Sequence, residues 1–563
     1  MAQVAADWIL ANGRILTFDR RAPRVEAVAI GDDRILAVGA SREMRRWRGR
    51  GTRWVDLKGA TVIPGLVDAH AHLDREGLKF LFPSLASCRS IADIQALLRR
   101  LAQGRQAGQW IVTMPVGQPP FYLRVPDCLA EKRMPTRWDL DGAAPAHPVY
   151  IRGIWGYWNK PPIFAAANSL ALRLAGITRE TAAPKGVEIL KDAAGEPTGV
   201  FIEHNVIPIL EFTLMKAVPR FTHADRVRAL KDSQRRYHAR GVTSVYEGHG
   251  VAPEVLRVYR ELDGRGALTM RTHLALSPAW RSLEEAGRQI PDLASWAGGT
   301  GIGDSLLRIC GIYLGYGGDP EVSRVLKEEL PYTGWAGFVE QANDPGTYQV
   351  LVRLAAGHGV RVNTIVTNQL REVLDAWEGV DRESPLRRRR WQLIHLARAR
   401  ASDLDRIRRV GAVVVTNPIS YLYRSGAEAL NAGGTGEDWL PHRALLRARI
   451  PFALGTDNKP PDPFLALRAV VARQDLSTGA VIGPNQRLTP AQALRAFTLG
   501  GACVLGREHK LGSLTPGKLA DLAVLSSDPL SVPVSELPDI RVRLTMVGGR
   551  PVHRHDPPEG AEP

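Results

Sequence analysis

Short apolar segments of strand length alternate with amphipathic helical segments through the middle of the chain. Alternation of this kind predicts parallel βα units. Eight such units close into a barrel, and the chemistry of these barrels lies at the C-terminal ends of the strands. The sequence therefore predicts an α/β protein built on a (β/α)8 TIM barrel, with the strands GLVDAHAHL, GVTSVYEGH, TMRTHLAL, LLRICGIYL, VRVNTIVT, QLIHLARA, AVVVTNPIS and PFALGTDN.

Two further apolar segments, QWIVTMPV and HPVYIRGIW, also have strand character. We assign them to a long insertion, at about residues 75–240, that follows the first barrel strand. The count of eight barrel strands depends on this assignment.

Both ends of the chain are rich in short β segments. Residues 7–58 contain several, and a second group lies in GSLTPGKLADLAVLSSDP and VRLTMVGGRPVH. Neither piece is large enough to bury a core of its own. We therefore expect residues 1–61 and 508–563 to form one small β-sandwich, while residues 62–507 form the barrel with its insertion.

The chain of 563 residues is basic, because 74 Lys and Arg against 58 Asp and Glu give a formal net charge of +16. Such an excess raises nucleic acid or an anionic surface as a partner. Most of the excess is scattered arginine, however, and the densest run, Arg387–Arg390, is typical of a solvated loop or helix end. Because no nucleic-acid-binding module is recognisable, we expect a small-molecule substrate and no nucleic acid.

The cysteines and the hydropathy bear on the cellular compartment. Four widely spaced cysteines form neither a C-x-x-C pair nor a disulfide framework, which favours a reducing compartment. The first residues lack a basic segment followed by an apolar core, and no uninterrupted apolar run reaches the ~18 residues of a membrane span. We expect a cytoplasmic protein with no membrane partner.

The segment VIPGLVDAHAHL carries two histidines at the end of an apolar run. In a β-strand alternate side chains point to opposite faces, so His70 and His72 emerge side by side on one face. Asp68 adds a carboxylate beside the pair. Neighbouring imidazoles favour a divalent transition metal, although one core histidine and one surface histidine would produce the same spacing.

Several motifs in a fixed order extend this observation over nearly the whole chain. They include ANGRILTFD, VIPGLVDAHAHL, PTRWDLDGAAPAHPVYIRG, NSLALRLAGI, GEPTGVFIE, ALGTDNKPPDPF and LGSLTPGKLADLAVL. With these motifs the sequence resembles the amidohydrolase superfamily, in particular the branch of N-substituted formamide deformylase-like metal-dependent hydrolases. The resemblance implies a distorted (β/α)8 barrel with a flanking β-sandwich, a possible homo-oligomer, and hydrolysis of a carbon–nitrogen bond by metal-activated water.

The resemblance also implies roles for single residues. His70 and His72 match the ligands of the first strand, and His395 in LIHLA matches the histidine of the sixth. Asp457 in LGTDN matches the last-strand aspartate, which contacts the metal and shuttles protons in the family. The alternatives are a core histidine for His395 and a turn or helix N-cap for Asp457.

Two positions depart from the family pattern. Arg308 stands where many relatives have a lysine whose carbamylated form bridges two metals, and Asn363 stands where relatives have the fifth-strand histidine. Arginine stays protonated and cannot bridge two cations, and an amide carbonyl is a poor substitute for imidazole. We therefore expect one divalent ion, zinc, held by His70, His72 and Asp457 with His395. Arg308 then stabilises an oxyanion or forms a salt bridge at the barrel rim.

Five residues are weaker candidates for substrate binding. Glu247 and His249 lie at the end of the second predicted strand and could instead supply a ligand or a structural contact. Tyr157 and Tyr421 lie in aromatic-rich segments that line an apolar pocket or form core, and Asn363 belongs to the fifth strand.

Three hypotheses about function remain. The first is a metal-dependent hydrolase of a non-peptide carbon–nitrogen bond in an amide, formamide, urea or imide. The second is a heterocycle deaminase, although the deaminase branches rely on the histidine that Asn363 replaces. The third is a catalytically degenerate barrel that binds a ligand.

Overall fold

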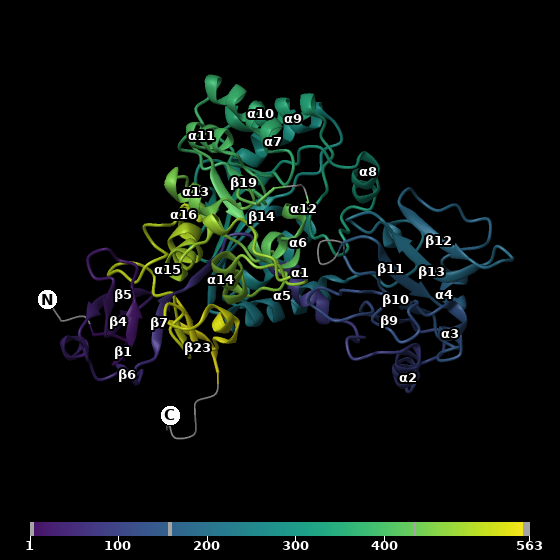
Figure 1. Ribbon diagram of the computed structural model, residues 1–563, viewed down its shortest axis with the longest axis horizontal. Coiled ribbons are helices and arrows are strands. Elements are labelled where there is room, and N and C mark those ends of the chain that lie inside the picture. Colours follow the sequence, from purple (N-terminus) through teal and green to yellow (C-terminus); the bar gives the residue numbers. More distant parts are fainter. Residues whose placement is uncertain (1–4, 156–159, 432–433, 556–563) are drawn as a thin grey trace.

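A computed structural model describes residues 5–155, 160–431 and 434–555. A central barrel carries a β-sandwich on one side and the insertion on the other (Figure 1). In the described residues, no helix is both long and apolar enough to span a membrane.

The barrel sheet contains all eight predicted strands in sequential order, all parallel, which confirms the predicted fold. The first and last strands are joined near their ends by the backbone bond from Ala69 N to Leu454 O. The strands are β8 (Leu66–Asp68), β14 (Val242–Val251), β15 (Arg271–Leu276), β17 (Leu307–Tyr313), β18 (Val362–Ile365), β19 (Gln392–Ile394), β20 (Val413–Thr416) and β21 (Phe452–Leu454).

Amphipathic helices surround this sheet and bury their apolar stripes against it, because each repeats apolar residues at helical spacing. Caps set their starts; for example, the Ser282 side chain accepts from Glu285 N. The main helices are α5 (His223–His238), α6 (Pro253–Gly264), α7 (Leu283–Ala297), α8 (Pro320–Glu328), α9 (Pro345–Gly357), α10 (Leu370–Glu383), α11 (Ala401–Val410), α13 (His442–Arg447) and α14 (Pro463–Ala472).

Both chain ends contribute to the β-sandwich. One sheet is purely N-terminal, whereas the other pairs N-terminal β7 and β2 with C-terminal β22 and β23. Pairing across the chain gives the small terminal pieces a shared core. The strand order of the N-terminal sheet is β5 (Arg34–Gly39), β4 (Ala27–Gly31), β1 (Trp8–Ala11), β6 (Arg53–Asp56). The strand order of the mixed sheet is β24 (Arg550–Arg554), β23 (Val542–Val547), β22 (Leu522–Leu525), β7 (Thr61–Pro64), β2 (Arg14–Leu16), β3 (Arg24–Val25).

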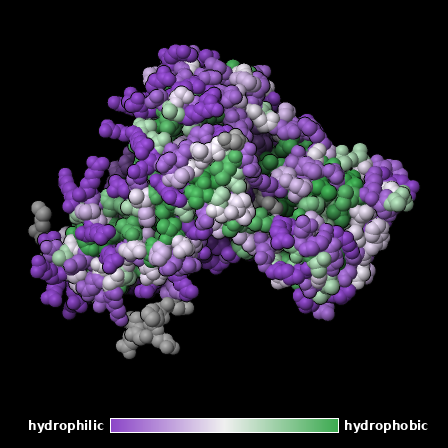
Figure 2. All heavy atoms as spheres, in the orientation of Figure 1, coloured by the Kyte–Doolittle hydropathy of each residue, from purple (hydrophilic) through white to green (hydrophobic). Residues whose placement is uncertain are grey.

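The insertion has its own five-stranded sheet and one apolar cluster of its own, and it shares a second cluster with residues 322–338 of the barrel. Helix α5, near the end of the predicted insertion, packs against α6 and belongs to the barrel's apolar cluster instead. Figure 2 shows hydrophobic residues where the insertion meets the barrel. The sheet order is β12 (Val187–Lys191), β13 (Pro197–Glu203), β11 (Ile163–Ala167), β10 (Val149–Ile151), β9 (Ile111–Thr113), with helices α2 (Ile91–Ala102), α3 (Arg137–Asp141) and α4 (Ser169–Leu174).

Candidate metal centre and active site

Four of the predicted site residues meet at one rim of the barrel. His70 and His72 follow the end of β8, His395 follows β19 directly, and Asp457 lies just beyond β21. The C-terminal ends of parallel barrel strands share one rim, so residues distant in sequence converge there. All four residues are buried, each at most 6 % exposed.

The donor atoms of these four residues face one another. His72 Nε2 lies 2.8 Å from Asp457 Oδ1, and His395 Nε2 lies 3.0 Å from His70 Nε2. Asp457 is also 3.6 Å from His70 Nε2 through Oδ1 and 3.7 Å from His395 Nε2 through Oδ2. Three ring nitrogens and one carboxylate therefore point at a common centre.

These separations fit ligand atoms that share one divalent ion, with His70, His72 and Asp457 as the compact group and His395 beside it. A Zn–N bond of about 2.0 Å places neighbouring ligand atoms about 3.3 Å apart, inside the range of the four measured distances. Candidate ligand atoms of His70, His72 and Asp457 all lie within 4.8 Å of one another. Histidine nitrogens with a carboxylate oxygen are also the donors that zinc prefers in catalytic sites.

The three histidines are neutral, as metal ligands must be. Burial lowers the pKa of His72 to about 3 and that of His395 to about 4. Burial also holds the pKa of His70 well below its ordinary value, with the other histidines acting in the same direction. A neutral imidazole keeps one lone pair for an ion.

Two further side chains fix the orientation of the rings. Glu247, at β14, lies 2.5 Å from His72 Nδ1, and the Tyr421 hydroxyl lies 2.9 Å from His395 Nδ1. When Nδ1–H donates to such a partner, the lone pair resides on Nε2 and points at the common centre. Burial raises the pKa of Glu247 well above its ordinary value, although Arg75 opposes the shift.

Lys459 is a site residue that the sequence reasoning missed. Its Nζ lies 2.5 Å from Asp457 Oδ2. Burial alone would raise the pKa of Asp457, but Lys459 and the neighbouring histidines hold it well below its usual value. The available signal was proximity, since Lys459 follows the aspartate by two residues in TDNKPP.

Asp68 and Asn458 hold the strand ends together. Asp68 accepts from the backbone of His70 and Thr456 and from the Thr456 hydroxyl, so its carboxylate links β8 to β21. Asn458 accepts from His72 N and donates to His72 O. These bonds fix the spacing between the two histidines and Asp457.

The backbone at this rim is strained. His395, Asp457 and Asn458 have φ values of 58°, 55° and 56°, in the left-handed region that side chains disfavour. Such conformations persist where the surrounding structure imposes them, and they concentrate at functional sites. Here the strain re-aims side chains at the points where the chain leaves β19 and β21.

A cavity of about 510 Å³ opens beside the cluster. This site cavity combines aromatic rings with charged and polar groups, the usual composition of a small-molecule site. The lining residues on which the later argument depends are His395, Tyr421, Lys459, Arg424, Glu340 and Tyr313.

The structure does not bring Arg308 to the site, so its predicted role was wrong. Arg308 is the second residue of β17, and its guanidinium donates to the carbonyls of Thr300, Gly301 and Gly303. The histidines and Asp457 follow strand ends, whereas Arg308 lies near a strand start. The guanidinium therefore holds the connection before β17.

Asn363 also does not line the site cavity. Its Oδ1 accepts from the Tyr246 hydroxyl at 3.0 Å, and its Nδ2 donates to Ile312 O. Both ends of the amide are satisfied inside the barrel. The residues of this strand and the following loop that line the site cavity are Ile365, Thr367 and Gln369.

The remaining candidates for substrate binding differ in where the structure places them. His249 stacks on Phe338 with ring centroids 3.8 Å apart, and its ring lies 6.1 Å from the His72 ring, so it packs beside the cluster. Glu247 contacts His72, as described above. Tyr157 lies outside the described residues.

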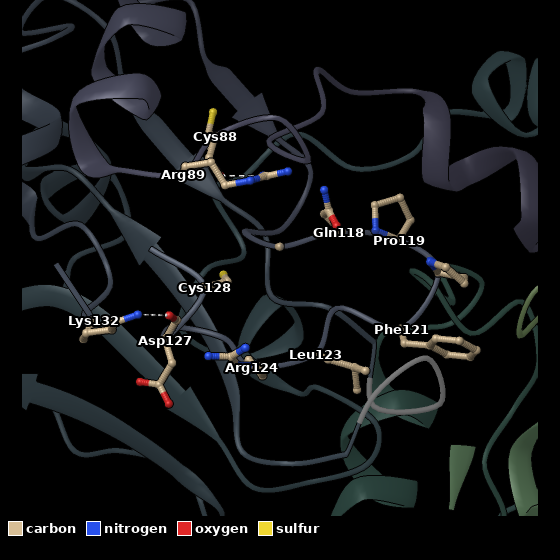
Figure 3. Close-up of a pocket in the computed structure, with 12 residues that line it drawn as sticks. Cys88, Arg89, Gln118, Pro119, Phe121, Leu123, Arg124, Asp127, Cys128 and Lys132 are labelled. Carbon is tan, nitrogen blue, oxygen red and sulfur yellow. Dashed lines mark hydrogen bonds between the residues drawn. The ribbon is translucent and has the colours of Figure 1, made fainter. Parts of the chain in front are cut away.

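A second cavity, of about 500 Å³, lies in the insertion and the segment leading to it (Figure 3). Cys88, Cys128, Arg89, Arg124 and Lys132 line it, and all four cysteines of the protein are free. None of the four cluster residues lines this second cavity.

Comparisons with known proteins agree with this geometry. A family model described as "Amidohydrolase family" matches residues 53–553. The chain is 27 % identical to N-substituted formamide deformylase of Arthrobacter pascens over 96 % of this chain and 97 % of that protein. It is 26 % identical to Protein LONG AFTER FAR-RED 3 of Arabidopsis thaliana, over 98 % of this chain and 92 % of that protein.

One solved structure shares the fold over nearly the whole chain. The crystal structure of an uncharacterized metal-dependent hydrolase from Pyrococcus furiosus aligns with a TM-score of 0.67 at 23 % identity. The alignment covers 93 % of this chain and 100 % of that one.

Proposed function

Since the chain belongs to the amidohydrolase family, we propose that it is a metal-dependent hydrolase of a carbon–nitrogen bond other than a peptide bond. The substrate class is an amide, formamide, urea or imide. The observation that carries the proposal is the convergence of His70, His72, His395 and Asp457 on one centre beside the site cavity.

His70, His72 and Asp457, with His395, are the residues that would hold one divalent zinc ion. When bound, such an ion lowers the pKa of water and polarises the substrate carbonyl. No second ligand group of three or more His, Cys, Asp or Glu exists among the described residues. Where β17 and β18 end, Tyr313 and Ile365 line the cavity, and neither favours a second ion.

Asp457 handles the proton in this proposal. Because Lys459 and the histidines hold its pKa low, the carboxylate is ionised and can accept the proton of the attacking water. For the same reason it is a weak base, which gives the proton up readily to the leaving nitrogen. Lys459 holds Oδ2 in place during both transfers.

His395 and Tyr421 face the cavity together, bonded through Nδ1 and the hydroxyl. In that arrangement His395 has no free N–H, so the Tyr421 hydroxyl is the donor placed to orient the carbonyl and to stabilise negative charge that develops on its oxygen. Both side chains are held by packing before substrate arrives, so little reorganisation is needed.

The test combines metal content with turnover. Protein purified without chelator should contain one zinc per chain, and should hydrolyse members of a panel of formamides, amides, ureas and imides. His72→Ala should lose the ion and the activity, because too few ligands remain. His358→Ala, an exposed histidine at the end of α9, is the matched control and should keep both.

Other outcomes would separate the hypotheses. Two zinc ions per chain would contradict the single-ion centre. Ammonia released from amino-heterocycles, without hydrolysis of the panel, would favour the deaminase. Neither metal nor turnover, with retained binding of panel compounds, would favour the catalytically degenerate barrel.

A further inference from the structure

Glu340 carries a carboxylate into the site cavity without a protein partner. It lies between α8 and α9, and it lines the same cavity as His395 and Tyr421. Its Oε2 is buried and accepts no hydrogen bond from the described residues, and no described ion pair involves the side chain. Glu340 as a whole is partly buried, but an oxygen that is shielded from water without a partner costs free energy, so its presence calls for a ligand.

The backbone around Glu340 is fixed. The carbonyl of Glu340 accepts from the Ser323 hydroxyl, and Val339 N donates to Ser277 Oγ. On the other side, Gln341 donates to Tyr313 O and accepts from Gly315 N. These bonds fix the segment from which the Glu340 side chain extends, which limits the reorganisation that a ligand must impose.

On the wall of the site cavity, the positively charged side chains lie apart from Glu340. Lys459 is paired with Asp457, and Arg424 lies near Asp457 and Tyr421. Burial is the sole cause that raises the pKa of Glu340, to about 7, so no cation among the described residues is close enough to offset it. Tyr313, which senses the charge of Glu340, and Tyr316 add aromatic rings to its side of the cavity.

We propose that Glu340 is a specificity-determining residue that selects substrates carrying a protonated amine away from the scissile bond. The ammonium group of the substrate forms an ion pair with the Glu340 carboxylate and contacts the faces of the tyrosine rings, which attract cations. The carbonyl end then lies toward His395. This inference rests on the proposed function, because it assigns the site cavity to the substrate.

Matched N-formyl compounds test the selection. Each pair has the same chain length and ends either in an ammonium group or in a methyl group, and several lengths are compared. The zinc-loaded enzyme should favour the ammonium compound in kcat/KM by about 10- to 100-fold at the best length, as for a hydrogen bond to a charged group. In Glu340→Gln this preference should fall to within about twofold of unity.

Two controls keep the result interpretable. Glu328→Gln removes an exposed glutamate of α8 and should leave the preference unchanged. Glu340→Asp keeps the charge on a shorter side chain, and should retain part of the preference if Glu340→Gln does not fold. Equal turnover of both compounds by the native enzyme, or an undiminished preference in Glu340→Gln, would overturn the proposal.

Equilibrium binding separates this proposal from the proposed function. Calorimetric titration of the same pairs measures the preference without turnover. If no compound is hydrolysed but the ammonium compound binds more tightly, and only in proteins with Glu340, the hydrolase proposal fails and the selection by Glu340 stands. If compounds are hydrolysed without a preference for the ammonium group, the hydrolase proposal stands and the selection by Glu340 fails.

Discussion

Gly455 sits where β21 leaves the sheet and lies against His70, one of the proposed metal ligands. A Cβ added there would lie 2.6 Å from His70 Cβ and 2.8 Å from His70 N. Carbon atoms in ordinary contact are about 3.5–4.0 Å apart, so Gly455→Ala must separate β21 from β8 by about 1 Å. The same backbone carries Asp457, whose N–H donates to His70 O at 2.9 Å.

The separation should damage the metal centre more than the fold. Overpacking of this kind costs about 1–3 kcal/mol, which lowers the melting temperature but leaves the barrel folded. Ligand distances in a metal site tolerate about 0.2 Å, so a shift of about 1 Å between His70 and Asp457 breaks the donor set. We expect zinc affinity to fall more than about 100-fold, beyond the loss typical of residues that only support a ligand.

The assay is competition of the protein with a fluorescent zinc chelator, together with calorimetric melting of the apo and zinc-loaded forms. Gly287→Ala is the matched control, because nothing lies within 4 Å of its added Cβ in helix α7. Its zinc affinity should equal that of the native protein. Native zinc affinity in Gly455→Ala would refute the assignment of His70 and Asp457 to one ion.

Four further predictions follow from single contacts. Glu247→Gln should weaken zinc binding by about 10- to 100-fold in chelator competition, because the carboxyl partner that orients a ligand histidine is lost; unchanged affinity would exclude that role. Tyr421→Phe should lower kcat/KM by about 2- to 10-fold with zinc content unchanged, since one hydrogen bond to His395 is removed. Arg308→Ala should leave zinc content and turnover unaltered while lowering the free energy of unfolding in urea titrations by about 1–3 kcal/mol, because its contacts are structural. Burial and nearby arginines hold the pKa of His273 well below its usual value, so below about pH 6.5 the unfolded chain binds more protons than the folded protein. The free energy of unfolding should therefore fall by up to about 1.4 kcal/mol for each unit by which the pH is lowered in that range. His273→Leu should flatten this part of the stability profile in denaturant titrations at several pH values.

The sequence determined the barrel and one edge of its site. Apolar runs and helical spacing are local signals, and each of the eight barrel strands was recognisable from them. The histidine pair was recognisable as well, because the period of a strand alone places His70 and His72 on one face. His395 and Asp457 needed the family resemblance, since nothing near either residue in the chain reveals that they approach His70.

Only the tertiary structure decided at which level along the barrel axis each side chain lies. The stagger of neighbouring strands depends on how the whole sheet closes, and the period of a single strand does not encode it. Arg308 was therefore placed at the wrong height, although its strand was correct. Lys459 and Glu340 lie on connections between elements, which carry no periodic signal, and they reach the site because the folded rim holds those connections there.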